Sequence, residues 1–232
     1  MTLPGRLPVV CLPGIRGHRA LFGPLVECLR AAGRSAEALH LPAGAPALAA
    51  SRVCLDADSV HLITGSYGGL VARHLPPSRI ASLTCIGTLP HPRHLQPAMA
   101  RQAQALCLLP DAVLERVYAA HSRRSLKAAG VPDCVRAELA QEPLGASVLR
   151  GRLKAVVDGR HGSPPPVPTL WVHGVDDGQV VWSTHDLKEA CPWAEQVKVP
   201  GGHFPHATHP APLLNAVLPF WRSAESDRAP VV

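Results

Sequence analysis

The most constraining feature of this sequence is a short apolar run that stops abruptly at a serine flanked by glycines. Val60 to Thr64 is β-branched and apolar, and Gly65-Ser66-Tyr67-Gly68-Gly69 then gives way to a helix-like segment. A strand that turns sharply into a helix exposes the turn residue above a parallel sheet, and small neighbours let the helix pass close by. The stretch therefore predicts a strand, a tight turn and a helix, with Ser66 as a candidate nucleophile. The alternative is a glycine-rich turn that carries an ordinary surface serine.

One residue of this stretch departs from the usual pattern. A serine on such a turn normally lies in Gly-x-Ser-x-Gly, and the first position of that pattern is Thr64 here. A branched side chain at that position has to be accommodated by rotation or by space opposite it. Thr64 is therefore the residue on which the catalytic interpretation depends most.

Elements of alternating type surround the serine turn. Short apolar runs predict strands at 8–12, 36–41, 60–64, 80–87, 169–173 and 196–199, and helical patterns fall at 20–32, 46–54, 183–190 and 210–222. Such alternation is typical of a parallel sheet covered by helices on both faces. We predict an α/β fold with about six mostly parallel strands.

The alternation stops between the fourth and fifth expected strands. Only helix-like segments occur there, at 97–109, 111–129, 132–141 and 144–157, and a proline-rich stretch closes them. We therefore predict a core of residues 1–90 and 167–232 and a helical insertion of residues 91–166.

Charge and cysteine content narrow the expected partners and location. Between His91 and Pro165, eleven Lys and Arg residues face six Asp and Glu residues, so the insertion holds most of the net charge of +6. A basic surface can steer an anionic substrate or carrier, but it is more often a solvated helix face. There is almost no aromatic residue among these charges, so we expect no nucleic-acid partner.

The seven cysteines are scattered without a Cys-x-x-Cys pair, and no signal peptide or membrane span is apparent, so we expect a cytoplasmic protein.

Polar side chains of three kinds follow three of the expected strands. Ser66 follows the strand at 60–64, Asp176 and Asp177 follow the strand at 169–173, and His203 follows the strand at 196–199. The carboxyl ends of parallel strands meet at one edge of a sheet, so we expect these groups to lie together. A serine hydroxyl needs a base in contact with it, and the base needs a carboxylate to orient it.

With these residues, the chain resembles the α/β-hydrolase fold superfamily over nearly its full length. Within that superfamily it resembles the serine esterases and thioesterases that carry a helical cap. The matching segments are LPGIRG, TGSYGG, HGVDDGQVV and PGGHFPHATHP, each behind an expected strand. The resemblance implies that Ser66 is the nucleophile and His203 the general base. The family's spacing favours Asp177 as the acid, with Asp176 as the alternative.

The resemblance also implies residues around this triad. The backbone N–H groups of Ile15 and Tyr67 would form the oxyanion hole, although the first loop reads Pro13-Gly14 where the family usually has His-Gly. Arg16 and His18 of the same loop either hold an anionic group of the substrate or face solvent. The insertion lies where the family has its cap.

We therefore expect a serine hydrolase that cleaves a carboxylic ester or thioester through an acyl-enzyme, with no cofactor and no metal. Its substrate would be a small molecule, which an anionic acyl carrier such as coenzyme A or phosphopantetheine could present. The alternative is a non-catalytic member of the same fold used for binding or assembly, which Thr64 and Pro13 favour. A lyase or a C–C bond hydrolase would use the same triad.

Overall fold

Six parallel strands form a single sheet in the part of the chain that the computed structural model describes, residues 6–91, 94–159 and 162–226. The sheet order is β2-β1-β3-β4-β5-β6, and every neighbouring pair is parallel. The strands are β1 (Val9–Leu12), β2 (Ala36–Ala38), β3 (Val60–Gly65), β4 (Ile80–Ile86), β5 (Thr169–Gly174) and β6 (Glu195–Val199). The predicted α/β fold is confirmed.

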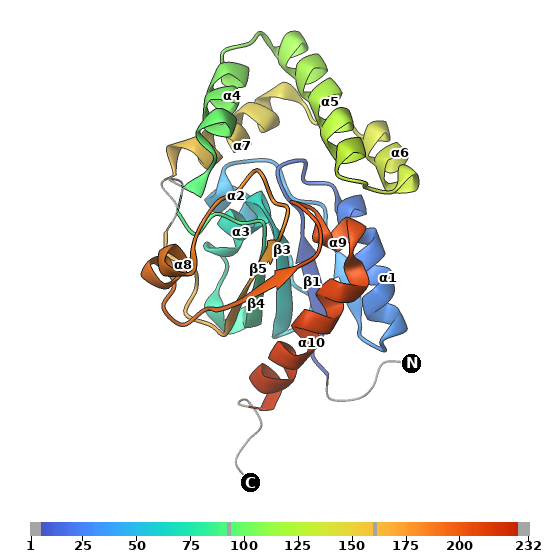
Figure 1. Ribbon diagram of the computed structural model, residues 1–232, viewed down its shortest axis with the longest axis vertical. Helices are drawn as coiled ribbons and strands as arrows, with labels where there is room; N and C mark the ends of the chain where they lie inside the picture. Colours follow the sequence, from blue (N-terminus) through green and yellow to red (C-terminus); the bar gives the residue numbers. More distant parts are fainter. Residues whose placement is uncertain (1–5, 92–93, 160–161, 227–232) are drawn as a thin grey trace.

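Helices cover both faces of this sheet (Figure 1). One face packs against α1 (Gly23–Ala31) and α10 (Pro210–Ser226), and the other packs against α2 (Pro46–Ala50), α3 (Tyr67–Ala72) and α8 (Thr184–Ala190). Short helical turns complete the core: η1 (Arg19–Phe22), η2 (Pro77–Arg79) and α9 (Pro205–Thr208).

Burial on both faces explains why the strands are almost continuously apolar. In β1, Val10 and Leu12 pack with α2, α3 and α8, whereas Val9 and Cys11 pack with α1 and α10. Successive side chains of a strand point to opposite faces, so a strand covered on both sides needs an apolar residue at every position.

Four helices lie between β4 and β5 and gather at one end of the core (Figure 1). They are α4 (Pro97–Cys107), α5 (Asp111–Ala128), α6 (Asp133–Gln141) and α7 (Ala146–Asp158). Buried residues such as Leu114 of α5 and Leu149 of α7 give α4, α5 and α7 a small apolar cluster of their own, whereas Leu139 of α6 packs with Leu21 of the core. The helical insertion therefore exists where the sequence predicts it, and its boundaries at 91 and 166 stay a prediction.

Several elements differ in length from the sequence expectation. The second strand ends at Ala38 rather than near Leu41, because it is an edge strand that pairs with β1 over three residues only. The last helix continues to Ser226 through Pro219, and the short helix α9 was not expected. None of the helices in the described ranges is long and apolar enough to cross a membrane.

The strand order fixes where a ligand can bind. β2 and β3 lie on opposite sides of β1, so the connections that leave β1 and β3 diverge at the carboxyl edge of the sheet. Such a reversal in strand order opens a crevice beyond the strand ends. The loop after β1 and the serine turn after β3 therefore lie side by side at this edge of the sheet.

Candidate active site

Ser66 lies on a strained turn between β3 and α3. Its backbone has φ 47° and ψ −113°, and in the described residues no other residue apart from glycine has a positive φ. Its N–H donates to the carbonyl of Ile86 at 2.8 Å, and its own carbonyl accepts from the Gly69 N–H at 3.0 Å. A conformation of this kind costs about 1–3 kcal/mol, and it persists only where the surroundings enforce it.

The glycine two residues after Ser66 lets α3 pass close to the end of β1. A Cβ atom on Gly68 would lie 2.5 Å from the Leu12 carbonyl oxygen and 2.7 Å from that of Pro13. Any side chain there would push the helix away, so Gly68 is required by the close approach itself.

Thr64 fits into this turn without an unsatisfied polar group. Its side chain is fully buried, and its hydroxyl donates to the Thr84 carbonyl of the neighbouring strand at 3.3 Å. The branched residue is therefore accommodated by β4 and leaves the Ser66 backbone in the strained conformation described above.

Asp177 and His203 are joined by a buried hydrogen bond. His203 Nδ1 lies 2.9 Å from Asp177 Oδ2. The loops that carry them approach closely at Gly174, where a Cβ atom would lie 2.1 Å from the Gly202 carbonyl oxygen. Asp176 is exposed and makes no side-chain contact of this kind in the described residues, so the structure brings Asp177 rather than Asp176 to the histidine.

The surroundings of Asp177 keep its carboxylate ionised. Burial alone would raise its pKa, but the hydrogen bond and charge of His203 and two backbone N–H groups outweigh burial and hold the pKa below its usual range. The backbone donors are the N–H groups of Gln179 at 2.8 Å and Val180 at 3.3 Å. A fixed carboxylate on Nδ1 leaves Nε2 of His203 as the nitrogen that can accept a proton.

Ser66 and His203 line the same cavity, which has a volume of about 170 Å³ and lies between the core and the insertion. No hydrogen bond joins the Ser66 hydroxyl to His203 among the contacts of the described residues. In ligand-free enzymes such contacts are often long and tighten only with substrate bound. The catalytic roles of Ser66, Asp177 and His203 stay a prediction.

The backbone groups expected in the oxyanion hole lie next to Ser66. A Cβ atom on Gly14 would be 3.3 Å from Ser66 Cβ, so the loop after β1 passes directly beside the serine. In the described part of the chain, no backbone carbonyl accepts from the N–H of Ile15 or of Tyr67. Both residues line the cavity. The arrangement leaves two donors free for a ligand oxygen.

Arg16 also lines the cavity, but its guanidinium is already engaged. It donates to Ser122 Oγ at 3.0 Å and to the Leu139 carbonyl at 2.7 Å, so it ties the loop after β1 to the insertion. Its Nε is buried and has no hydrogen-bond partner among the described residues.

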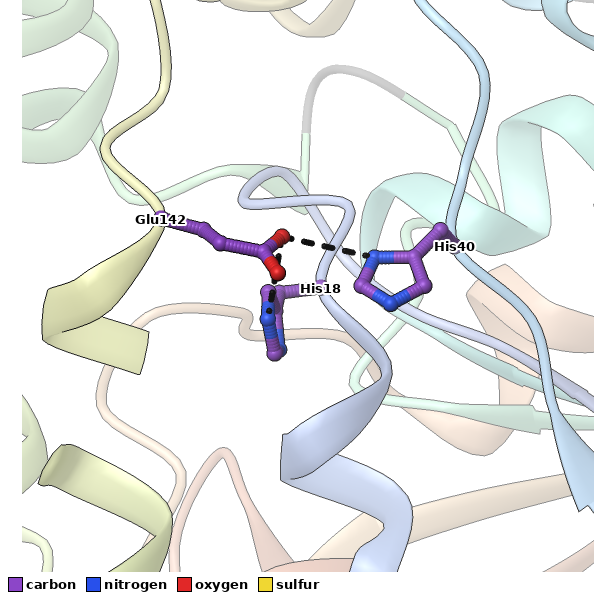
Figure 2. A group of neighbouring side chains, drawn as sticks. All are labelled: His18, His40 and Glu142. Carbon is purple, nitrogen blue, oxygen red and sulfur yellow. Dashed lines mark ion pairs between the residues drawn. The ribbon is translucent and has the colours of Figure 1, made fainter. Parts of the chain in front are cut away.

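His18 is not among the residues that line the cavity, and its side chain meets Glu142 and His40, as Figure 2 shows. Its Nε2 lies 3.3 Å from Glu142 Oε2, and its Nδ1 accepts from the Ala20 N–H at 3.1 Å. The structure therefore does not bring His18 to the lining of the cavity that holds Ser66.

Two histidines and a glutamate are also a possible metal-ligand set. A metal-bound histidine normally donates a hydrogen bond from its second ring nitrogen. Nδ1 of His18 accepts a bond instead, so the proton of the neutral ring is on Nε2, directed at Glu142. This geometry favours a hydrogen bond between loop and insertion over a metal site.

Sequence reasoning did not single out His206 for this site. Its ring is stacked on Phe22 at 4.3 Å between centroids, and it lines the cavity close to Gly65. Burial, together with the nearby His203, lowers its pKa to about 3, so the ring stays neutral at ordinary pH. Its place three residues after His203 was the available signal, but spacing does not reveal burial.

A second row of serine, histidine and carboxylate occurs at the opposite edge of the sheet. Ser82 Oγ lies 2.8 Å from His61 Nδ1, and His61 Nε2 lies 3.0 Å from Glu225 Oε1. Ser82 and His61 are both fully buried inside strands. This row is therefore structural, and it provides a natural comparison for Ser66.

The comparisons with known proteins identify the fold. The sequence matches no family model, and no curated protein matches it significantly. Among solved structures it is similar to a hydrolase from Pseudomonas aeruginosa PA01, with 20% identity, a TM-score of 0.68 and coverage of 95% of this chain and 91% of the other.

Two further structures have the same architecture. The 2-hydroxy-6-oxo-6-phenylhexa-2,4-dienoate hydrolase of Rhodococcus sp. strain RHA1 has 18% identity and a TM-score of 0.70 over 95% of this chain and 92% of its own. The thioesterase domain from the curacin biosynthetic pathway has 18% identity and a TM-score of 0.65 over 94% and 93%. The chain therefore has the α/β-hydrolase fold.

Proposed function

We propose that this protein is a serine hydrolase that cleaves an ester or thioester with an apolar acyl group. The observation that carries the proposal is the strained Ser66 turn, which faces the same cavity as a histidine whose other ring nitrogen is bound by a buried aspartate. Ser66 attacks the carbonyl carbon while His203 Nε2 takes its proton and Asp177 stabilises the resulting imidazolium. His203 then protonates the leaving group, and water hydrolyses the acyl-enzyme by the reverse route.

Oxyanion stabilisation is assigned to the N–H groups of Ile15 and Tyr67. Neither group has a backbone acceptor in the described residues; Ile15 lies in the loop that approaches Ser66 at Gly14, and Tyr67 follows Ser66 directly at the start of α3. Two preorganised donors at the carbonyl oxygen stabilise negative charge that develops in the transition state. The reaction needs no metal and no cofactor.

The lining of the cavity supports an apolar acyl group. Most of its side chains are aliphatic or aromatic and come from both the core and the insertion, among them Leu21, Leu70, Met99, Leu106, Leu153 and Phe204. Apolar surface of this kind favours an alkyl or aryl chain, with a few polar groups to orient it. The insertion then acts as the cap that closes the cavity.

A second proposal concerns the leaving group, for which we propose an anionic acyl carrier. Arg136 and Arg150 pair with Asp133 and Asp111, and Arg152 is buried, so the basic surface of the insertion is smaller than its charge count. Arg93 and Arg160 lie outside the described residues. Exposed basic residues on α4 and α5 remain, including Arg101, Arg116, Arg123 and Arg124. A carrier thioester should then react faster than a neutral ester at low salt and lose this advantage at high salt.

The cytoplasm is the compartment that we propose. All seven cysteines are unpaired, which supports a reducing environment.

A fluorophosphonate probe tests the central proposal. The wild-type protein should be labelled once, at Ser66, and should hydrolyse short p-nitrophenyl esters, whereas Ser66→Ala should lose both properties. Ser82→Ala is the matched control, because Ser82 also contacts a histidine but is buried, and it should keep both. Labelling and turnover that survive in Ser66→Ala would refute the assignment. A wild-type protein that takes no label and binds acyl ligands without turnover would instead support the non-catalytic alternative.

A further inference from the structure

Arg152 is a buried cation that the proposed reaction does not use directly. It lies on α7 of the insertion, it is 1% exposed, and among the described residues no carboxylate lies within ion-pair distance of it. Burying a guanidinium without a counter-ion costs several kcal/mol unless its donors are satisfied. The groups that accept hydrogen bonds from its guanidinium therefore indicate its role.

Those partners are backbone carbonyls of two core loops. Nη1 donates to the Ile15 carbonyl at 2.8 Å, and Nη2 donates to the carbonyls of Leu41 at 2.9 Å and Pro42 at 3.0 Å. The guanidinium also lies over the Tyr67 ring, 5.6 Å from its centroid. A planar fork of donors can hold several carbonyls at fixed angles, which the single ammonium of lysine cannot do.

The Ile15 carbonyl belongs to the central peptide of a tight turn. The Gly17 N–H donates to the Gly14 carbonyl at 2.8 Å and closes the turn. The carbonyl of this central peptide takes no part in closing the turn, so the bond from Arg152 is an additional restraint on the peptide. Gly17 has a φ of +70°, and a Cβ atom there would lie 2.3 Å from Arg152 Nη1, so the glycine makes room for the guanidinium.

The same turn sets the direction of the Ile15 N–H. Because a trans peptide is planar, this N–H points opposite to the Gly14 carbonyl, which is directed at Gly17. The N–H is therefore directed out of the turn, and Gly14 places the turn against Ser66. A turn that relaxes would move this donor relative to the serine.

We propose that Arg152 is a positioning residue that holds the Gly14–Gly17 turn, so that the Ile15 N–H meets the oxyanion formed at Ser66. This inference rests on the proposed function. It gives the insertion a second role, because α7 then orients a donor of the core in addition to covering the cavity. Arg16 and His18 also bind the insertion, through Ser122, Leu139 and Glu142, but by their side chains rather than through the central peptide.

Kinetics of three variants test the inference. Arg152→Met removes the donors and keeps the apolar stem, and Arg152→Lys keeps the charge but not the fork. Arg150→Met is the matched control on the same helix, because the partners of the Arg150 guanidinium among the described residues are Cys107, Leu109 and Asp111, all within the insertion.

With a p-nitrophenyl ester, Arg152→Met should lose about tenfold to hundredfold in kcat, while KM stays within about threefold. An interaction that acts only in the transition state lowers kcat in this way without weakening substrate binding. Arg152→Lys should fall between Arg152→Met and the wild type, and Arg150→Met should keep the wild-type kcat. If Arg152→Met does not fold, the kcat of Arg152→Lys is compared with that of the wild type and of Arg150→Met instead.

Amide hydrogen exchange gives a readout that does not depend on activity. The Gly17 N–H should exchange faster in the Arg152 variants than in the wild type and in Arg150→Met, while the amides of β3 and β4 stay protected. Unchanged exchange at Gly17, or equal losses of kcat in the Met variants of Arg150 and Arg152, would overturn the inference. If the wild type takes no fluorophosphonate label, the proposed function fails, and the exchange data alone decide whether Arg152 holds the turn.

Discussion

Ser66 and Ser82 show what a polar residue needs in order to be a candidate nucleophile. Each has in its surroundings a histidine that binds a carboxylate, but Ser82 lies within β4, is fully buried and has no access to solvent. Ser66 lies one residue beyond a strand end, in a positive-φ conformation, and faces a cavity. A histidine and a carboxylate near a serine are therefore not sufficient to make it a candidate nucleophile, because reactivity also requires exposure of the serine at the strand end.

The choice between Asp177 and Asp176 gives a prediction at the same scale. Asp177→Asn should lower kcat by about 10³–10⁴-fold, because an amide cannot stabilise the imidazolium and favours the wrong tautomer of His203. Asp176→Asn should stay within about twofold of the wild type, because the Asp176 side chain is exposed. Steady-state ester hydrolysis by the two variants measures the difference. Equal losses in both would mean that the whole turn, rather than one carboxylate, is required.

At the scale of elements, α10 is anchored at its C-terminal end by a partly buried ionic cluster. Glu225 accepts from Arg34 Nη1 at 2.5 Å and from His61 at 3.0 Å, and Trp221 stacks on His61 at 4.9 Å. These contacts join the last helix to β3 and to the loop before β2. Removing Glu225 would leave the buried Arg34 side chain without its carboxylate partner, which is costly, so the cluster should contribute measurably to stability.

The cluster predicts how stability depends on pH. Burial would raise the pKa of Glu225, but the bonds from Arg34 and His61 outweigh burial and lower it to about 2 from an ordinary value of 4.5. A lowered folded-state pKa stabilises the protein above about pH 4.5, and this contribution is lost as the pH falls toward about 2. Between pH 5 and pH 3, urea unfolding should show a loss of about 1–2 kcal/mol from this group. Glu225→Gln should lack this part of the slope, and parallel pH profiles for the two proteins would contradict the prediction.

Local patterns predict the strand ends of this fold well and the contacts between segments poorly. Ser66, Asp177 and His203 could be placed together because each follows an apolar run, and parallel strands end at one edge. Thr64 looked like an obstacle, since its acceptor on β4 belongs to a different segment. Arg152 was counted among surface charges, because its partners are carbonyls of residues 15, 41 and 42, more than a hundred positions away. No local pattern records a contact of that kind.

At the scale of the whole molecule, the cavity belongs to neither the core nor the insertion alone. Ser66, Gly87 and His203 come from the core, whereas Ala103, Leu106 and Leu153 come from α4 and α7. The reacting groups are thus assigned to residues at the sheet edge, with Arg152 of α7 positioning one of them, and much of the acyl site is assigned to α4 and α7. Residues of α4 that line the cavity should then control chain-length preference without changing the rate with a short acyl group.

Substitution on α4 tests this division. Ala103 is buried and lines the cavity, so Ala103→Phe should fill space that a long acyl chain needs and lower kcat/KM for an octanoyl ester by about tenfold or more relative to an acetyl ester. Ala105→Phe is the matched control, because Ala105 is exposed on the same helix. The ratio of kcat/KM for p-nitrophenyl octanoate and acetate measures the effect, and kcat for the acetate should change little in either variant. An unchanged ratio in Ala103→Phe would mean that the acyl chain lies elsewhere, and that the insertion does not shape the acyl site.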